Sequence, residues 1–443
     1  MCRCEENLGP AGRFSVLDGS GRELYEGGAP RIDPADVAGP WHYGGDFTAL
    51  HEAGGDFRIR FEAGNQVATS DRFGLGSKIL WRLAKPLVLH MLRTSRASAE
   101  NHRDGSYRAP GTLRDDGTFY DVGGGWFDGG DTGGTSLRYG LRALLGLTFA
   151  RQQDVRDPQI DAEIRHGADW LRRLMITYPS SGAMVSRTCE DGTLRLLGDA
   201  DEANTVELGV GFAFAKISEA LGDVDLLRRG VRFWRKYRDA GGPDERGARL
   251  LTAVALHVTT LEPGYLAAAE REAEELVVAL DERAEAEERD FPEGDVYTVA
   301  ALSEFAASDP QNPLTPRVKL ALGRYLDSRV ECCRQDAFGL TPLPRGAGAA
   351  DEPLCRAEQA WAALSAYRVT GRTSYVELAC NALNWMLGLN SGNVSLVRGA
   401  GVNSAGEHPA DAPHGAVVPL SPDVRESARL GCTAAFLMAL SLL

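Results

Sequence analysis

Helical periodicity constrains the fold more than any other feature, because it runs from about residue 73 to the end of the 443-residue chain. Apolar residues recur there at the three- and four-residue spacing that gives a helix one apolar face. The predicted helices span residues 74–97, 136–152, 159–177, 203–220, 224–239, 246–260, 264–287, 294–308, 315–334, 355–371, 374–389 and 424–443. Since the connections between most of them are short, the helices are expected to form six antiparallel hairpins.

Hairpins of this kind have to bury their apolar faces against one another, as a bundle, a solenoid or a closed ring. The sequence contains no repeated consensus of about 34 or 40 residues, which argues against a solenoid. The number of hairpins fits an (α/α)6 toroid best. We therefore predict a mainly α fold, with an (α/α)6 barrel over residues 71–443.

Residues 1–70 follow a different pattern, which is typical of β-strands. Phe57, Ile59 and Phe61 alternate with charged residues, as in a strand with one buried face. The segment "RFSVLDGSGRELYEG" adds two short runs around a turn. A small β-sandwich over residues 1–70 is the expected package.

Composition excludes several classes of function. The net charge of −14 repels phosphate backbones, so we expect no nucleic-acid partner. No apolar run reaches the roughly 18 residues of a membrane span, so no membrane association is expected. The N-terminal "MCRCEENLGPAGRF" lacks the basic and apolar regions of a signal peptide, which favours a cytoplasmic location.

Two long inserts, residues 98–135 and 390–423, interrupt the helical pattern. Long loops within a compact domain are usually functional or disordered. In a toroid, such loops gather at one mouth of the ring. We therefore expect the two inserts to come together.

The first insert contains "GGGWFDGGD", residues 123–131. Its glycines allow a ligand to approach the backbone closely. Asp128 and Asp131 could hold a water molecule between them, and one of them could accept its proton. Trp126 and Phe127 offer flat apolar faces that suit the C–H face of a sugar ring. A solvated acidic turn and a calcium loop are the alternative interpretations.

A third acid, Glu426, lies at the start of the last predicted helix. Glutamate is common there because it complements the helix dipole. The functional alternative is a general acid, kept protonated by burial in a cleft.

These segments resemble glycoside hydrolase family 9. "YDVGGGWFDGGD" is similar to the family signature D-V-S-G-G-W-x-D-A-G-D, and "YVELACNALNWMLGLNSGNVSLVRGAG" and "PDVRESARLGCTAAFLMALSLL" resemble two later family blocks. "GPWHYGGDFTALHEAGGDFRIRFEAG" is similar to the end of the family's N-terminal immunoglobulin-like module. The four blocks occur in the family's order and span nearly the whole chain. The resemblance implies a short immunoglobulin-like module over residues 1–70 and a catalytic barrel over residues 71–443.

The resemblance also implies an inverting hydrolysis of an O-glycosyl bond. Asp131 would act as general base, Asp128 would help to hold the attacking water, and Glu426 would protonate the leaving oxygen. In inverting enzymes the acid and the base lie roughly 6.5–9.5 Å apart, which leaves room for the water.

The chain departs from the family where cellulases bind their polymer. The family cluster "hPHHR" is replaced by "EHPADAPHG", which retains His408 but has Ala-Asp-Ala in place of the next His, His and Arg. His408 and His414, which stands at a different spacing, remain candidate substrate-binding residues. After Glu426, the family's Asp-Tyr-Asn is replaced by Leu430, Gly431 and Cys432. The expected substrate is therefore a small soluble β-glycoside, oligosaccharide, amino sugar or glycosylated metabolite, and not crystalline cellulose.

No cofactor is expected to be required. The family's cysteine–histidine zinc cluster is not reproduced, because "SAENHRDG" keeps His102 without a neighbouring cysteine. Calcium stays open, since its oxygen ligands leave no fixed spacing outside the EF-hand. The alternative function is a repurposed relative that binds a ligand or performs different chemistry in a biosynthetic pathway. A purely structural protein would require the three acids to match the family context by accident.

Overall fold

The computed structural model describes residues 2–32, 41–76, 78–98, 110–113, 119–128, 134–155, 157–176, 184–189, 193–197, 209–239, 245–286, 289–334, 336, 338–401, 403, 415–418 and 429–443. Contacts divide the chain into two compact units. The first contains Met1–Leu83 and Arg334–Phe338, and the second contains Ala84–Cys333 and Gly339–Leu443. The first unit thus extends past residue 70, where the sequence suggested the division.

The first unit is built from antiparallel strands. Its main sheet has the order β3-β2-β5-β6, with β7 also paired to β5, and a two-stranded sheet pairs β1 with β4. The strands are β1 (Cys2–Cys4), β2 (Ala11–Leu17), β3 (Glu23–Pro30), β4 (Trp41–Tyr43), β5 (Gly54–Ala63), β6 (Gln66–Thr69) and β7 (Phe73–Leu75). The two predicted runs are confirmed as strands, because β2 and β3 pair on either side of the expected turn.

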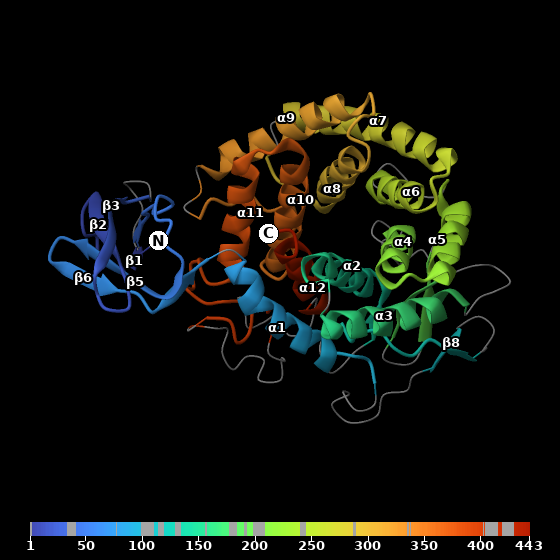
Figure 1. Ribbon diagram of the computed structural model, residues 1–443, viewed down its shortest axis with the longest axis horizontal. Helices are drawn as coiled ribbons and strands as arrows, with labels where there is room; N and C mark the ends of the chain where they lie inside the picture. Colours follow the sequence, from blue (N-terminus) through green and yellow to red (C-terminus); the bar gives the residue numbers. More distant parts are fainter. Residues whose placement is uncertain are drawn as a thin grey trace. The chain divides into compact units, whose positions relative to one another are not determined.

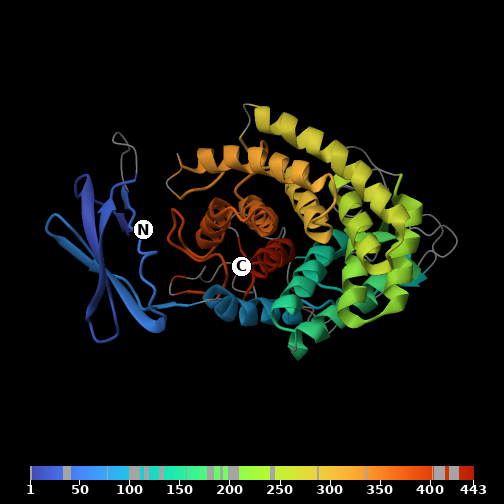
Figure 2. The same ribbon diagram turned by 45° about the horizontal axis from the view of Figure 1, so that its top comes forward.

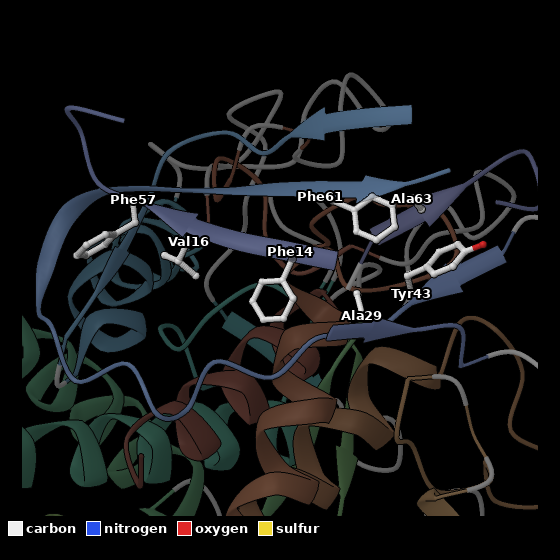
Figure 3. Close-up of a cluster of buried hydrophobic side chains, with 7 residues drawn as sticks. All are labelled: Phe14, Val16, Ala29, Tyr43, Phe57, Phe61 and Ala63. Atoms are coloured by element: carbon white, nitrogen blue, oxygen red, sulfur yellow. The ribbon is translucent and has the colours of Figure 1, made fainter. Parts of the chain in front are cut away.

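The apolar core of this unit explains the alternation seen in β5. Phe57 and Phe61 are buried, whereas Arg58 and Arg60 between them are exposed. Figure 3 shows the buried side chains gathered beside the strands that carry them. They are Phe14, Val16, Ala29, Tyr43, Phe57, Phe61 and Ala63.

The second unit contains the helices. All twelve predicted helices have counterparts in the described part of the chain, with boundaries that differ by a few residues. The helices are α1 (Ile79–Thr94), α2 (Leu137–Gln153), α3 (Pro158–Ile176), α4 (Val210–Leu221), α5 (Val224–Tyr237), α6 (Arg246–Thr260), α7 (Pro263–Glu285), α8 (Glu293–Ser308), α9 (Thr315–Cys333), α10 (Glu352–Thr370), α11 (Thr373–Met386) and α12 (Arg429–Leu440). Of these, α1 begins within the first unit and continues into the second. None of the described helices combines the length and apolar character that crossing a bilayer requires.

The even-numbered helices form a closed inner ring. Each packs on the next, and α12 packs on α2, which completes the circle. The odd-numbered helices from α3 to α11 lie outside this ring, as Figure 1 shows from one direction and Figure 2 from another. The predicted (α/α)6 toroid is therefore confirmed.

The inner helices are buried on more sides than the outer helices. Inner α2 is buried continuously from Gly140 to Ala150, since other helices cover it on several sides. Outer α5 buries only Leu226, Gly230, Phe233 and Trp234, which follow the spacing of a single helix face. Each inner helix from α2 to α10 is followed by an outer helix that packs on it and returns in the opposite direction, so these inner helices run the same way. The first turn of α12 lies against the first turn of α2, as Gly431 and Tyr139 show. The N-terminal ends of the inner helices therefore converge at one mouth of the ring.

A second small sheet in this unit was not predicted. Its order is β10-β11-β12-β8-β9, with β12 and β8 parallel and the other pairs antiparallel. Its strands are β8 (Pro110–Leu113), β9 (Phe119–Asp121), β10 (Thr135–Ser136), β11 (Val185–Thr188) and β12 (Thr193–Leu196). Strands of two to four residues are too short to display a period in the sequence. The edge strands β9 and β10 flank the acidic loop, so this sheet positions both ends of that loop.

Candidate active site

The first half of the acidic loop is attached to the end of α1. The backbone N–H of Phe127 donates to the carbonyl of Ser95 at 2.8 Å. The N–H of Ala97 donates to the carbonyl of Gly125 at 2.9 Å. Residues 123–128 of the loop are therefore held against the end of α1 by backbone hydrogen bonds.

Two of the glycines are required by the backbone path of this loop. Gly124 and Gly125 have φ values of +113° and +75°, which disfavour any residue with a side chain. A Cβ on Gly125 would also lie 2.7 Å from the indole of Trp170 on α3. On the same helix, His166 contacts the Gly125 carbonyl through Nε2 at 2.8 Å. The backbone of the loop thus lies directly on α3.

Trp126 and Phe127 are core residues, which corrects the prediction that they bind sugar. Only 1% of Trp126 and 0% of Phe127 are exposed to solvent. The Trp126 ring meets Trp170 edge-on at 6.4 Å between centroids, and its Nε1 donates to Glu163 at 3.4 Å. Neither ring presents a face to a ligand. The two rings instead anchor the loop in the hydrophobic core of the second unit.

Replacing Trp126 with leucine tests this assignment. We expect the free energy of unfolding to fall by about 1–3 kcal/mol, because the smaller side chain leaves a cavity in the core. Glu163 would keep its ion pair with Arg96, so loss of the indole hydrogen bond should add little. The KM for a glycoside substrate should stay close to that of the wild type. Denaturant titration together with steady-state kinetics measures both quantities. A large rise in KM at unchanged stability would restore the sugar-stacking interpretation.

Asp128 lies at the junction between the loop and α2. Its backbone N–H donates to the carbonyl of Gly134 at 3.1 Å, and its Oδ1 accepts from the N–H of Ser136 at 3.1 Å. Ser136 is also the N-cap of α2. The two ends of segment 129–133 are therefore joined by a hydrogen bond at its base. Asp131 belongs to this segment and lies outside the described residues.

Both inserts contact the N-terminal part of α12. The N–H of Leu430 donates to the carbonyl of Asp128 at 3.3 Å. The hydroxyl of Thr433, one turn later, accepts from the N–H of Val417 at 2.9 Å. The described parts of the two inserts therefore contact the same stretch of one helix, as expected if the inserts come together. Glu426, His408 and His414 lie outside the described residues.

Tyr139 is a residue of this region that the sequence analysis missed. It is half-buried in the first turn of α2, and its backbone N–H is capped by Ser136. A Cβ built on Gly431 of α12 would lie only 2.5 Å from Cδ1 of the Tyr139 ring. Burial raises the pKa of its phenol, with Asp128 among the smaller contributors and the nearby arginines opposing the rise. An aromatic ring of α2 thus packs against the first turn of α12.

Four charged side chains form a network at the same end of the inner ring. Arg138 Nη2 donates to both carboxylate oxygens of Glu293, at 2.8 and 2.6 Å. Arg142 Nη2 contacts Glu293 at 2.8 Å, and Arg142 Nε donates to Glu358 at 2.8 Å. The side chains of Arg142 and Glu358 are 1% and 5% exposed, whereas those of Arg138 and Glu293 are 29% and 33% exposed. The network therefore extends from solvent into the protein interior and connects α2, α8 and α10.

The two glutamates of the network differ in their electrostatic environment. Burial opposes ionisation of Glu293, but Arg142 and Arg138 outweigh it, so its pKa lies below the ordinary value. Burial raises the pKa of Glu358, and Glu293 adds to that rise, whereas Arg142 and more weakly Arg138 oppose it. Glu293 is thus the more firmly ionised of the two.

No local sequence pattern identifies the glutamates of this network. Glu293 and Glu358 are 155 and 216 residues away from their arginine partners. Arg138 and Tyr139 do follow the acidic loop closely, and their position in the first turn of α2 was the signal that could have identified them. In the described ranges, no group of three or more His, Cys, Asp or Glu residues is arranged to hold a metal ion.

Comparison with known proteins finds relatives in one curated sequence and in many solved structures, whereas no family model matches the sequence. A cellodextrinase of Butyrivibrio fibrisolvens is 26% identical over 186 residues, which cover 37% of this chain and 34% of that protein. The match therefore spans only about a third of the curated relative.

Solved structures match over nearly the full length. A metagenome-derived family 9 endoglucanase has a TM-score of 0.69 at 17% identity and covers 98% of this chain and 93% of its own. A family 9 glycoside hydrolase of Bacteroides ovatus has a TM-score of 0.66 at 17% identity, with 98% and 94% covered. AaCel9A, solved with a cellobiose-like isofagomine, has a TM-score of 0.67 at 16% identity, with 98% and 95% covered. The resemblance to family 9 is thus confirmed at the level of the fold.

Proposed function

We propose that this chain, which has the fold of family 9 glycoside hydrolases, is an inverting glycoside hydrolase. The hydrogen bond between the Leu430 N–H and the Asp128 carbonyl carries the proposal. Asp131 follows Asp128 by three residues, and Glu426 precedes Leu430 by four. Since consecutive Cα atoms are about 3.8 Å apart, we expect both acids to lie within reach of this contact. On this proposal, a base from the first insert and an acid from the segment before α12 serve one site.

The proposed reaction is a single displacement. Asp131 accepts a proton from a water molecule as its oxygen attacks the anomeric carbon, and Glu426 donates a proton to the departing glycosidic oxygen. Asp128 helps to hold the water, and the Ser136 N–H orients one of its carboxylate oxygens. The bond from carbon to the leaving oxygen breaks as the bond to water forms. The configuration at the anomeric carbon is therefore inverted.

A small soluble β-glycoside is the proposed substrate. The partial similarity to a cellodextrinase supports an oligosaccharide, since that relative is named for acting on short chains. The Ala-Asp-Ala segment in place of the family's gripping residues argues against crystalline cellulose. His408 and His414 remain the proposed substrate contacts within the second insert. Amino sugars and glycosylated metabolites belong to the same proposal.

Product stereochemistry tests this function directly. Cello- and chito-oligosaccharides and aryl β-glycosides are incubated with the protein, and the anomeric proton signals are followed by NMR. We expect at least one β-linked substrate to give the α-anomer as its first product. Initial release of the β-anomer would contradict the inverting mechanism.

The alternative is a repurposed relative that binds a ligand or performs different chemistry. The altered residues after Glu426 favour it, because Leu430 and Cys432 are buried apolar side chains where the family carries polar ones. Absence of release from every glycoside, together with tight binding of a metabolite that contains no sugar, would support this alternative.

A further inference from the structure

The ring of Tyr139 on α2 packs against the backbone of α12 at Gly431. Gly431 lies in the first turn of α12, next to the Leu430 N–H that donates to Asp128. The edge of the Tyr139 ring occupies the space that a side chain at position 431 would need, with Cδ1 at 2.5 Å and Cε1 at 2.7 Å from the position of the missing Cβ. The glycine is therefore what allows an aromatic ring from α2 to lie over α12.

Polar groups that suit a sugar lie near this ring. The guanidinium of Arg142 lies over one face of the ring, with Cζ 5.9 Å from the centroid, which leaves the other face for a ligand. Arg142 shares Glu293 with Arg138, and the Arg138–Glu293 pair is about one-third exposed. The phenol of Tyr139 lies within electrostatic range of Asp128, Arg138 and Arg142. Binding sites for small molecules typically combine an aromatic surface with a few well-placed polar groups. The acidic loop, the ring and the exposed ion pair provide that combination.

We propose that Tyr139 is the aromatic surface on which one pyranose ring of the substrate stacks, and that the exposed Arg138–Glu293 pair hydrogen-bonds hydroxyls of the same sugar. This inference rests on the proposed function and names the sugar-recognition residues of that site. It replaces Trp126 and Phe127, which are buried.

The proposal can be tested by moving the tyrosine from position 139 of α2 to position 431 of α12. The direction of the missing Cβ at Gly431 leads into the space of the Tyr139 ring. A tyrosine at position 431 should therefore fill this space when position 139 is alanine. The double variant Tyr139→Ala/Gly431→Tyr keeps an aromatic ring in place but supplies it from α12.

The test measures kcat and KM for an aryl β-cellobioside and the Kd of cellobiose by calorimetry. Tyr139→Ala should raise KM and Kd by about 10-fold or more, with a smaller change in kcat. Tyr139→Phe, which keeps the ring, should retain most of the affinity, and the double variant should recover part of it. Tyr367→Ala serves as the control, because Tyr367 is exposed near the opposite end of α10 and should leave all values unchanged. Thermal unfolding of each variant reports its folding.

A Tyr139→Ala variant that folds and keeps the wild-type KM and Kd would overturn the inference. A loss of thermal stability and kcat without weaker binding would also overturn it, since Tyr139 would then be a packing residue. If Tyr139→Ala does not fold, Gly431→Ala provides the test, because its methyl group displaces the ring and should likewise raise Kd. Wild-type protein that binds cellobiose without turnover would contradict the proposed hydrolysis but leave the binding comparison intact. Wild-type protein that neither binds nor cleaves any glycoside would overturn both proposals.

Discussion

Replacing Asp131 with asparagine is expected to lower kcat by about 10²–10⁴-fold, the usual contribution of one positioned proton transfer. The substitution keeps the shape of the side chain but removes the basic oxygen that accepts the proton of water. Replacing Glu426 with glutamine should cause a loss of the same order on a natural oligosaccharide, because the leaving oxygen then departs without a proton. Thermal unfolding of both variants should resemble that of the wild type.

The choice of leaving group separates the two roles. A 2,4-dinitrophenyl β-cellobioside has a leaving group that needs little protonation. Glu426→Gln should therefore lose far less activity on this substrate than on an oligosaccharide. Asp131→Asn should lose similar activity on both, since water must be deprotonated in either case. Kinetics on matched substrates measure the difference.

Asp121→Asn is a suitable control for these variants. Asp121 is an exposed acid on β9, seven residues before Asp128, and its Oδ1 accepts from the Gly123 N–H at 3.1 Å. Asparagine can accept the same hydrogen bond, so activity should change little. Wild-type kcat in both Asp131→Asn and Glu426→Gln would show that the assigned acid and base are wrong.

The helical architecture could be predicted because it follows from local periodicity repeated along the chain. Outer helix α5 shows the amphipathic spacing directly, and Gly222 and Gly371 end α4 and α10 in the left-handed conformation that glycine favours. The strands β8 to β12 could not be predicted in this way. Each is too short for a period, and their pairing depends on residues brought together only by the tertiary fold.

The candidate site was predicted less completely, for a physical reason. An aromatic residue beside an acid has the same sequence whether its ring faces a ligand or the core, and Trp126 proved to face the core. Tyr139 depends on a glycine almost three hundred residues later, which no local pattern reveals. The roles of Asp131, Glu426, His408 and His414 remain predictions, as do the cytoplasmic location and the immunoglobulin-like nature of the first unit.

Arg142→Met is expected to destabilise the second unit by about 3–5 kcal/mol, the cost of breaking a buried ion pair by removing one partner. The Glu358 side chain is 5% exposed, and Arg142 is its partner in the network. Its carboxylate would remain buried and either unpaired or forced to take up a proton. Glu293 would keep Arg138, so the damage should centre on Glu358.

Two further variants test this explanation. Arg138→Met removes an arginine that is 29% exposed from Glu293, and should cost only about 0–1 kcal/mol, because solvent screens this partly exposed pair and Glu293 keeps Arg142. The double variant Arg142→Met/Glu358→Met removes both buried charges together and should regain much of the lost stability, since uncharged side chains of similar size often replace buried pairs without loss. Denaturant midpoints measured at one pH allow the comparison. Equal losses for Arg138→Met and Arg142→Met would contradict the assigned difference in burial, and a double variant less stable than Arg142→Met would show that Glu358 has another essential partner.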